Sequence, residues 1–142
     1  EGLVDCPIFL VSEELEKERA RYYDLLNSVR GDNPDWYAWL SFFVEACGRM
    51  TEKLLHKLSN AERLAVEGLK KCYLESERNI WLYSFSDPYT NAARVVEKLN
   101  ISPATARKGL NKLAEEGLLY ADESVKRNKT YRNYDLLRII GN

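Results

Sequence analysis

The chain has 142 residues, a hydrophobic fraction of 45%, a charged fraction of 30% and a formal net charge of -1. This length suits one large domain or two small ones, and the small net charge excludes a general attraction to polyanions, so a nucleic-acid site must be local. Three cysteines far apart in sequence, Cys6, Cys47 and Cys72, argue against a disulfide framework or a metal site. The longest apolar run is too short to span a bilayer, and we expect a cytoplasmic protein without cofactors or membrane contact.

Residues 1–58 are predicted to form a helical domain. Residues 3–11, "LVDCPIFLV", contain Pro7 and favour an extended entry, after which Ser12 can cap a helix that runs to Gly31. A second helix follows Asp35, and its apolar residues recur at helical spacing: Trp36, Leu40, Phe43, Cys47, Met50, Leu54 and Leu58. Trp39, Phe42 and Val44 widen this face. A face of that width needs partners on two sides, which favours self-association, and we expect a homodimer.

Residues 59–75 are predicted to be a helical linker. "SN" at 59 and 60 either breaks or re-caps the preceding helix, and apolar residues continue beyond it at helical spacing. "NIWLYSF" (79–85) fits a strand or a buried helix by periodicity, and the turn "SDPYT" that follows favours the helix. Thr90 is then predicted to cap a short helix that ends at Asn100.

The segment "SPATARKGLNKLAEEGLL" (102–119) predicts a well-delimited helix over 102–116. Ser102 can cap it, Pro103 occupies a position where a missing N–H costs nothing, and Gly117 suits the left-handed residue after its last turn. At about 100° per residue, one side faces a core with Ala106, Leu110, Leu113 and Ala114. The opposite side carries Ala104, Lys108, Asn111, Lys112 and Glu115, flanked by Thr105 and Arg107.

The stretch "LLYADESVKRNKTYRNYDLL" predicts a hairpin: a strand ending near Ala121, a basic tip with "KRNK", and a returning strand around "TYRNY". Two short helices joined by a few residues and followed by a basic hairpin resemble the winged helix-turn-helix family, through "NISPATARKGLNKLAEEGLL" and "KRNKTY". The expected fold is therefore mainly α, a helical segment followed by a winged helix-turn-helix domain over residues 76–142 with a small β-hairpin wing.

Positive charge is concentrated in this module. Residues 87–142 hold ten Lys or Arg and seven Asp or Glu, a local +3, which leaves eleven basic and fifteen acidic residues, -4, in residues 1–86. Double-stranded DNA is the expected partner, with wing cations on phosphates and helix side chains at base edges. The candidate contacts are Ser102, Thr105, Arg107, Lys108, Asn111 and Lys112 on the helix, and Lys126, Arg127 and Lys129 on the wing. The alternative is a module for protein docking or dimerisation.

The first half has a resemblance of its own. The order "GLVDCPIFLVSEELEK", "RARYYDLLNSVR" and "WYAWLSFFVEA", over roughly residues 1–55, is similar to the closing helices of the Fic domain family. Members of that family transfer AMP onto hydroxyl side chains of target proteins, and many bacterial members carry a winged helix after this region. The resemblance implies a C-terminal regulatory fragment of such a protein, and the absence of an initial methionine favours a fragment as well.

The family's catalytic motif, HxFx[DE]GNGRxxR, does not occur in the sequence. Its histidine acts as a base, and its glycine-rich loop and arginines hold the nucleotide phosphates. The one histidine here, His56, lies between Leu55 and Lys57 with no such loop after it, and is expected to be a surface residue. No residue of this chain therefore inherits a catalytic role, and the resemblance places adenylyl transfer in the parent protein alone.

Overall fold

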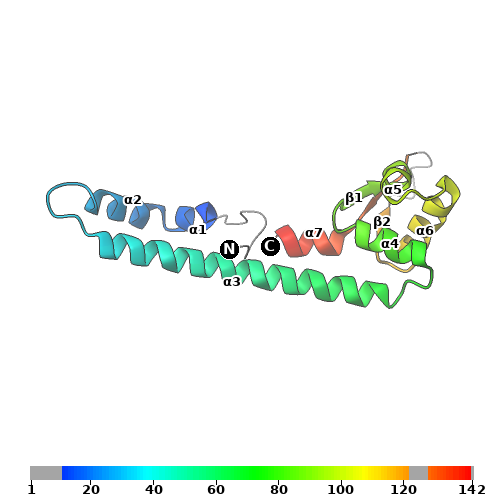
Figure 1. The fold of residues 1–142 in the computed structure, drawn as a ribbon, viewed down its shortest axis with the longest axis horizontal. Coiled ribbons are helices and arrows are strands. Elements are labelled where there is room, and N and C mark those ends of the chain that lie inside the picture. Colours follow the sequence, from blue (N-terminus) through cyan, green and yellow to red (C-terminus); the bar gives the residue numbers. More distant parts are fainter. Residues whose placement is uncertain (1–10, 122–127, 142) are drawn as a thin grey trace. The chain divides into compact units, whose positions relative to one another are not determined.

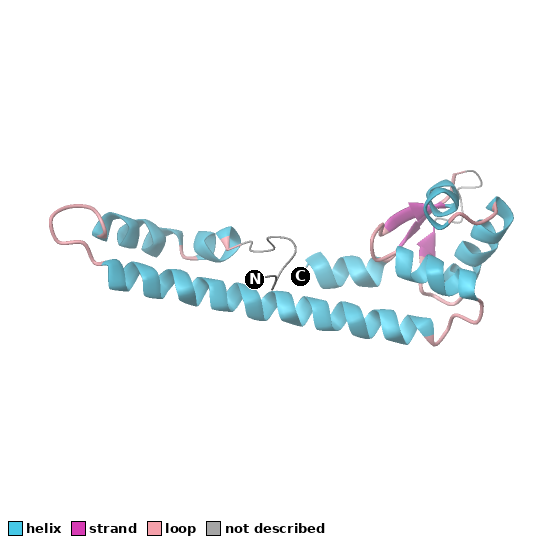
Figure 2. Ribbon diagram, in the orientation of Figure 1, coloured by secondary structure: helices cyan, strands magenta, loops and turns pink. Residues whose placement is uncertain are grey.

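A computed structural model describes residues 11–121 and 128–141 of the chain, which divides into two compact units, Glu1–His56 and Lys57–Asn142. The described part of the first unit is helical, whereas the second combines helices with a small sheet (Figures 1 and 2). The division falls inside one long helix, α3 (Trp36–Leu69). The domain and linker boundaries predicted at residues 58, 59 and 76 stay predictions. Residues 3–10 of the segment predicted to be extended lie outside the described residues.

The first unit begins with two short helices, α1 (Ser12–Lys17) and α2 (Arg19–Ser28). The prediction of one helix capped by Ser12 was wrong, because Val11 holds the N-cap position and the helix is interrupted at Glu18, whose φ is -114° and ψ 40°. The Glu18 carboxylate accepts hydrogen bonds from Arg21 at 2.9 Å and from Arg49 of α3 at 2.6 Å. The predicted turn at Gly31 is confirmed, since its φ of +101° is one that glycine adopts without strain.

The α1–α2 layer packs on the first part of α3 through an aromatic contact and a charged cluster. Tyr22 and Trp39 have ring centroids 5.4 Å apart. The Glu14 carboxylate is buried and accepts hydrogen bonds from Lys17 at 2.7 Å and from Lys53, which lower the pKa of Glu14 to about 2. A buried carboxylate paired in this way avoids the cost of an unpaired buried charge.

The buried side of α3 differs from the predicted stripe. Phe42, Ala46 and Met50 are the α3 residues of the first unit that are buried, whereas the predicted core positions Leu40 and Leu58 are each 54% exposed. The predicted face is therefore confirmed at Phe42 and Met50 and wrong at Leu40 and Leu58, because apolar residues occur on more than one side of α3 and the packing of α1 and α2 selects which side is covered. The helix passes through Ser59 and Asn60 without a break.

The second unit continues with α4 (Glu75–Tyr83), β1 (Tyr89–Asn91), α5 (Ala92–Leu99), α6 (Pro103–Glu115), β2 (Tyr120–Ala121), β3 (Thr130–Arg132) and α7 (Tyr134–Gly141). The three strands form an antiparallel sheet in the order β1-β3-β2. The helix predicted for "NIWLYSF" is confirmed over residues 79–83 by α4, which ends at Tyr83. The predicted strand at "TYRNY" is confirmed for its first three residues, after which the chain turns into α7.

Thr90 does not cap α5, so that prediction was wrong. It lies in β1, fully buried and paired with Tyr131, and the side chain of Asn91 accepts the hydrogen bond from the Arg94 N–H at 3.0 Å instead. Asn91 is as good an N-cap as threonine, and the pairing of β1 with β3 draws Thr90 into the sheet. The strand β1 and the helix α7 were not predicted.

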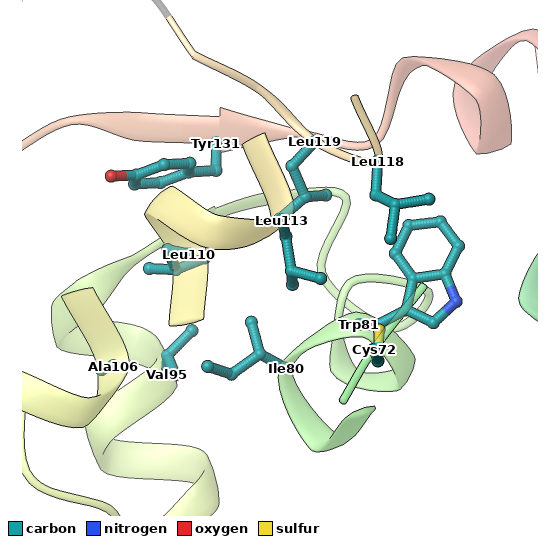
Figure 3. Packing of buried hydrophobic residues seen from close by; sticks show 10 residues of the cluster. All are labelled: Cys72, Ile80, Trp81, Val95, Ala106, Leu110, Leu113, Leu118, Leu119 and Tyr131. Carbon is teal, nitrogen blue, oxygen red and sulfur yellow. The ribbon is translucent and has the colours of Figure 1, made fainter. Parts of the chain in front are cut away.

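A single apolar cluster holds the second unit together (Figure 3). Its buried members are Cys72, Ile80, Trp81, Val95, Ala106, Leu110, Leu113, Leu118, Leu119 and Tyr131. Trp81 connects the end of α3 to this cluster, because its Nε1–H donates to the Ala65 carbonyl at 2.9 Å. Leu64 and Leu69, within the predicted linker, also pack against the cluster. The last turns of α3 therefore form part of the folded unit.

Candidate nucleic-acid interface

The two helices α5 and α6 form a helix-turn-helix joined by residues 100–102. Asn100 ends α5 in the left-handed conformation, with φ 52° and ψ 43°, which turns the chain sharply toward α6. Val95 on α5 and Ala106 and Leu110 on α6 are fully buried in the same cluster. The core-facing side predicted for 102–116 is thereby confirmed at Ala106, Leu110 and Leu113, so the opposite side of α6 is the one presented outward.

The start of α6 uses both hydroxyl groups that were predicted to contact DNA. Ser102 caps the helix as predicted, since its Oγ accepts from the Thr105 N–H at 3.1 Å, and the two hydroxyl oxygens lie 2.9 Å apart. Pro103 occupies the first turn. Backbone N–H groups at a helix N-terminus, together with its positive dipole end, suit an anion such as a phosphate.

The outward side of α6 carries three of the predicted DNA contacts in exposed positions, Arg107, Lys108 and Asn111. Lys112 is more constrained, because its Nζ lies 2.8 Å from a Glu116 carboxylate oxygen and 3.9 Å from one of Glu115. The hydrogen bond to Glu116 raises the pKa of Lys112. The acidic residues at the end of α6 therefore pair with Lys112. The other basic side chains of the helix, Arg107 and Lys108, lie nearer its start.

The predicted wing corresponds to β2 and β3. Lys129, just before β3, is half-buried, and its Nζ lies 5.8 Å from the ring centroid of Tyr131. Two further predicted phosphate contacts, Lys126 and Arg127, lie outside the described residues. Two basic side chains that the sequence analysis did not select lie close to the sheet: Arg94, which binds Asp87 at 3.0 Å, and Arg132, which donates to the Tyr134 hydroxyl at 3.0 Å.

One side chain joins the wing to the outward side of α6. The Tyr131 hydroxyl donates to Oδ1 of Asn111 at 2.6 Å. Sequence analysis missed Tyr131, because a tyrosine in a strand is ordinarily a core residue and the partner lies 20 positions earlier in the chain. No local pattern could have paired these two residues.

In the described part of the chain, no three His, Cys, Asp or Glu side chains are grouped so that they could hold a metal ion. Nor does any helix within residues 11–121 and 128–141 have both the length and the apolar character needed to cross a membrane.

The order of α5, α6, β2 and β3, with β1 completing a small antiparallel sheet, defines a winged helix-turn-helix, and the predicted fold class is confirmed. Residues 88–120 match the DeoR-like helix-turn-helix domain. That range contains β1, α5 and α6 and ends at the first residue of β2. No curated protein was found to match the chain. The matched domain supports a DNA-binding regulatory module.

Proposed function

We propose that the second unit binds duplex DNA as a transcriptional regulator, with α6 in the major groove and the wing on neighbouring phosphates. The observation that carries this proposal is the outward side of α6, where exposed Arg107, Lys108 and Asn111 follow a capped helix start within a domain of the DeoR-like type. Basic and amide side chains are those that read base edges in the major groove. The promoter of its own gene is the site that we propose for it.

The predicted contacts fall into two groups. Lys126, Arg127 and Lys129 are proposed to bind phosphates, together with Ser102 and Thr105 at the start of α6. Arg107, Lys108, Asn111 and Lys112 are proposed to face base edges. Phosphate contacts release counterions and therefore make affinity depend on salt, whereas contacts to bases make it depend on sequence.

Titration of labelled duplexes from the gene's upstream region, at several salt concentrations, tests the proposal. Lys129→Ala should weaken binding on all sequences and reduce the salt slope by about one unit. Lys108→Ala should cost about 1 to 3 kcal/mol on the preferred duplex and less on others. Arg138→Ala is the matched control, since Arg138 is an exposed cation on α7, at the other end of the unit from α6 (Figure 1).

Affinity that stays millimolar at low salt, or that changes equally with all three substitutions, would contradict DNA binding. Protein docking through this module would then be the better account.

We further propose that the chain self-associates through α3. Tyr37, Leu40 and Val44 are 84%, 54% and 66% exposed, and they line a groove with Ser41 and Glu45. With half-buried Cys47 they follow the spacing of three and four residues that brings two helices together in a coiled coil. A second copy of the same helix is the partner that this spacing suits, and a dimer would present two α6 helices to DNA.

A third proposal concerns parentage and rests on the resemblance of residues 1–55 to the closing helices of Fic domains. We propose that this chain is the regulatory part of a protein whose transferase motif precedes residue 1. The sequence encoded directly before Glu1 tests it: HxFx[DE]GNGRxxR within that stretch supports the proposal, and a different domain there refutes it.

A further inference from the structure

Tyr131 occupies the most constrained place in the small sheet. It is the middle residue of the central strand, paired with Thr90 of β1 on one side and Ala121 of β2 on the other. Tyr131 is 5% exposed as a whole residue, and Figure 3 shows its hydroxyl directed away from Leu118, Leu119 and Trp81. Since the backbone is held on both sides and the ring is packed, the hydroxyl has a fixed position relative to α6.

This hydroxyl determines which end of the Asn111 amide faces out. Tyr131 donates to Oδ1 of Asn111 at 2.6 Å, so the amide oxygen is turned toward the sheet and the Nδ2 group is left to meet a ligand. Burial raises the pKa of the Tyr131 hydroxyl, which keeps it a hydrogen-bond donor over the physiological range. An asparagine without such a partner can present either end of its amide.

The two orientations suit different bases. A bidentate contact with adenine needs an amide that donates to N7 and accepts from the N6 amino group, whereas guanine offers two acceptors, N7 and O6, and no donor on that edge. With Oδ1 engaged by Tyr131, Asn111 offers N–H donors. We infer that Tyr131 is a positioning residue which makes Asn111 select guanine over adenine in the major groove. The inference rests on the proposed DNA binding and adds one specified base to it.

Selection from a random duplex library, followed by sequencing of the bound pool, measures this preference for the full chain. The wild type should enrich guanine at one position, and Asn111→Ala should reduce that enrichment about 2- to 12-fold, as expected for one neutral hydrogen bond, and leave the other positions unchanged. Tyr131→Phe keeps the ring and frees the amide, so the same position should shift toward adenine. The double variant should match Asn111→Ala at that position, because the hydroxyl acts only through the amide.

Tyr120→Phe is the matched control, since Tyr120 is a 42% exposed tyrosine on the neighbouring strand β2, and it should leave the selected base unchanged. Thermal unfolding followed by circular dichroism identifies any variant that has lost the fold. Asn111→Asp is then used in place of such a variant. A carboxylate cannot donate a hydrogen bond, so guanine enrichment should be lost in Asn111→Asp. Adenine enriched by the wild type, or guanine enrichment that survives Tyr131→Phe unchanged, overturns the inference while leaving DNA binding intact. A wild type that enriches no duplex and binds none at low salt overturns the proposed function as well.

Discussion

At the scale of single residues, Gly68 of α3 leaves room for the side chain of Trp81. A Cβ built on Gly68 would collide with the indole of Trp81, whose Nε1–H donates to the Ala65 carbonyl one turn earlier. Trp81 itself is fully buried. The glycine at position 68 is therefore required by the approach of the indole to the backbone of α3, and not by a turn.

Gly68→Ala should lower the free energy of unfolding by about 1 to 3 kcal/mol, because the added methyl forces a packed indole to move. Gly48→Ala is the matched control: the same substitution in the same helix, at a site where a Cβ meets nothing within 4 Å. It should raise stability by about 0.5 to 1 kcal/mol through helix propensity. Urea unfolding followed by circular dichroism checks both, and two changes of the same sign would contradict the assigned contact.

At the scale of elements, side-chain caps fix where the short helices begin. Ser102 caps α6, Asn91 caps α5, and Asn133 accepts from the Leu136 N–H at 3.1 Å in the first turn of α7. Asn133 also donates to the Ser84 hydroxyl at 2.9 Å and so links α7 to the end of α4. Short helices are marginal on their own, so caps and packing together determine their ends.

Substitutions at Ser102 separate the cap from the proposed phosphate contact. Ser102→Ala should cost about 1 kcal/mol of stability, because the Thr105 N–H loses its acceptor. Ser102→Asp retains a capping oxygen and should keep stability near that of the wild type, but it places a negative charge where a phosphate is proposed to lie and should weaken DNA binding. Thermal unfolding and DNA titration on the same samples check this. Equal DNA affinity for wild type and Ser102→Asp would exclude a phosphate at the start of α6.

At the scale of the whole molecule, the local excess of basic residues and the groove proposed for self-association lie in different units. Residues 87–142 carry the local excess of basic residues, and the exposed groove residues Tyr37, Leu40 and Val44 belong to the first unit. The two proposals, DNA binding and self-association, can therefore be tested independently.

Val44→Glu should convert a dimer into a monomer, because it places a charge among the apolar side chains of the proposed interface. Sedimentation measures this change in oligomeric state. It is run at about micromolar protein concentration, because many proteins associate with dissociation constants of that order. Val66→Glu gives the control, since Val66 is 50% exposed on the same helix but belongs to the second unit, and it should leave the dimer intact. A monomeric wild type, or equal dissociation by both variants, would contradict an interface at this groove.

The sequence by itself determined those structural features that depend on residues close together along the chain. The capped and proline-started α6, its buried Ala106, Leu110 and Leu113, the turn at Gly31 and the paired strands of the wing follow from local residue chemistry and helical or strand spacing. The winged helix-turn-helix could be predicted because its elements occur in order with short connections. Of the candidate contacts, the exposure of Arg107, Lys108 and Asn111 was predictable from the same spacing.

Only the tertiary structure decided what depends on partners far apart in sequence. Thr90 was predicted to cap a helix, but the pairing of β1 with β3 places it in the sheet. The packing of α1 and α2 buries the side of α3 that carries Phe42. Tyr131 gained its contact with Asn111 in the same way. A local pattern fixes the faces of an element, but the free energy of burying one face rather than another depends on which element packs against it.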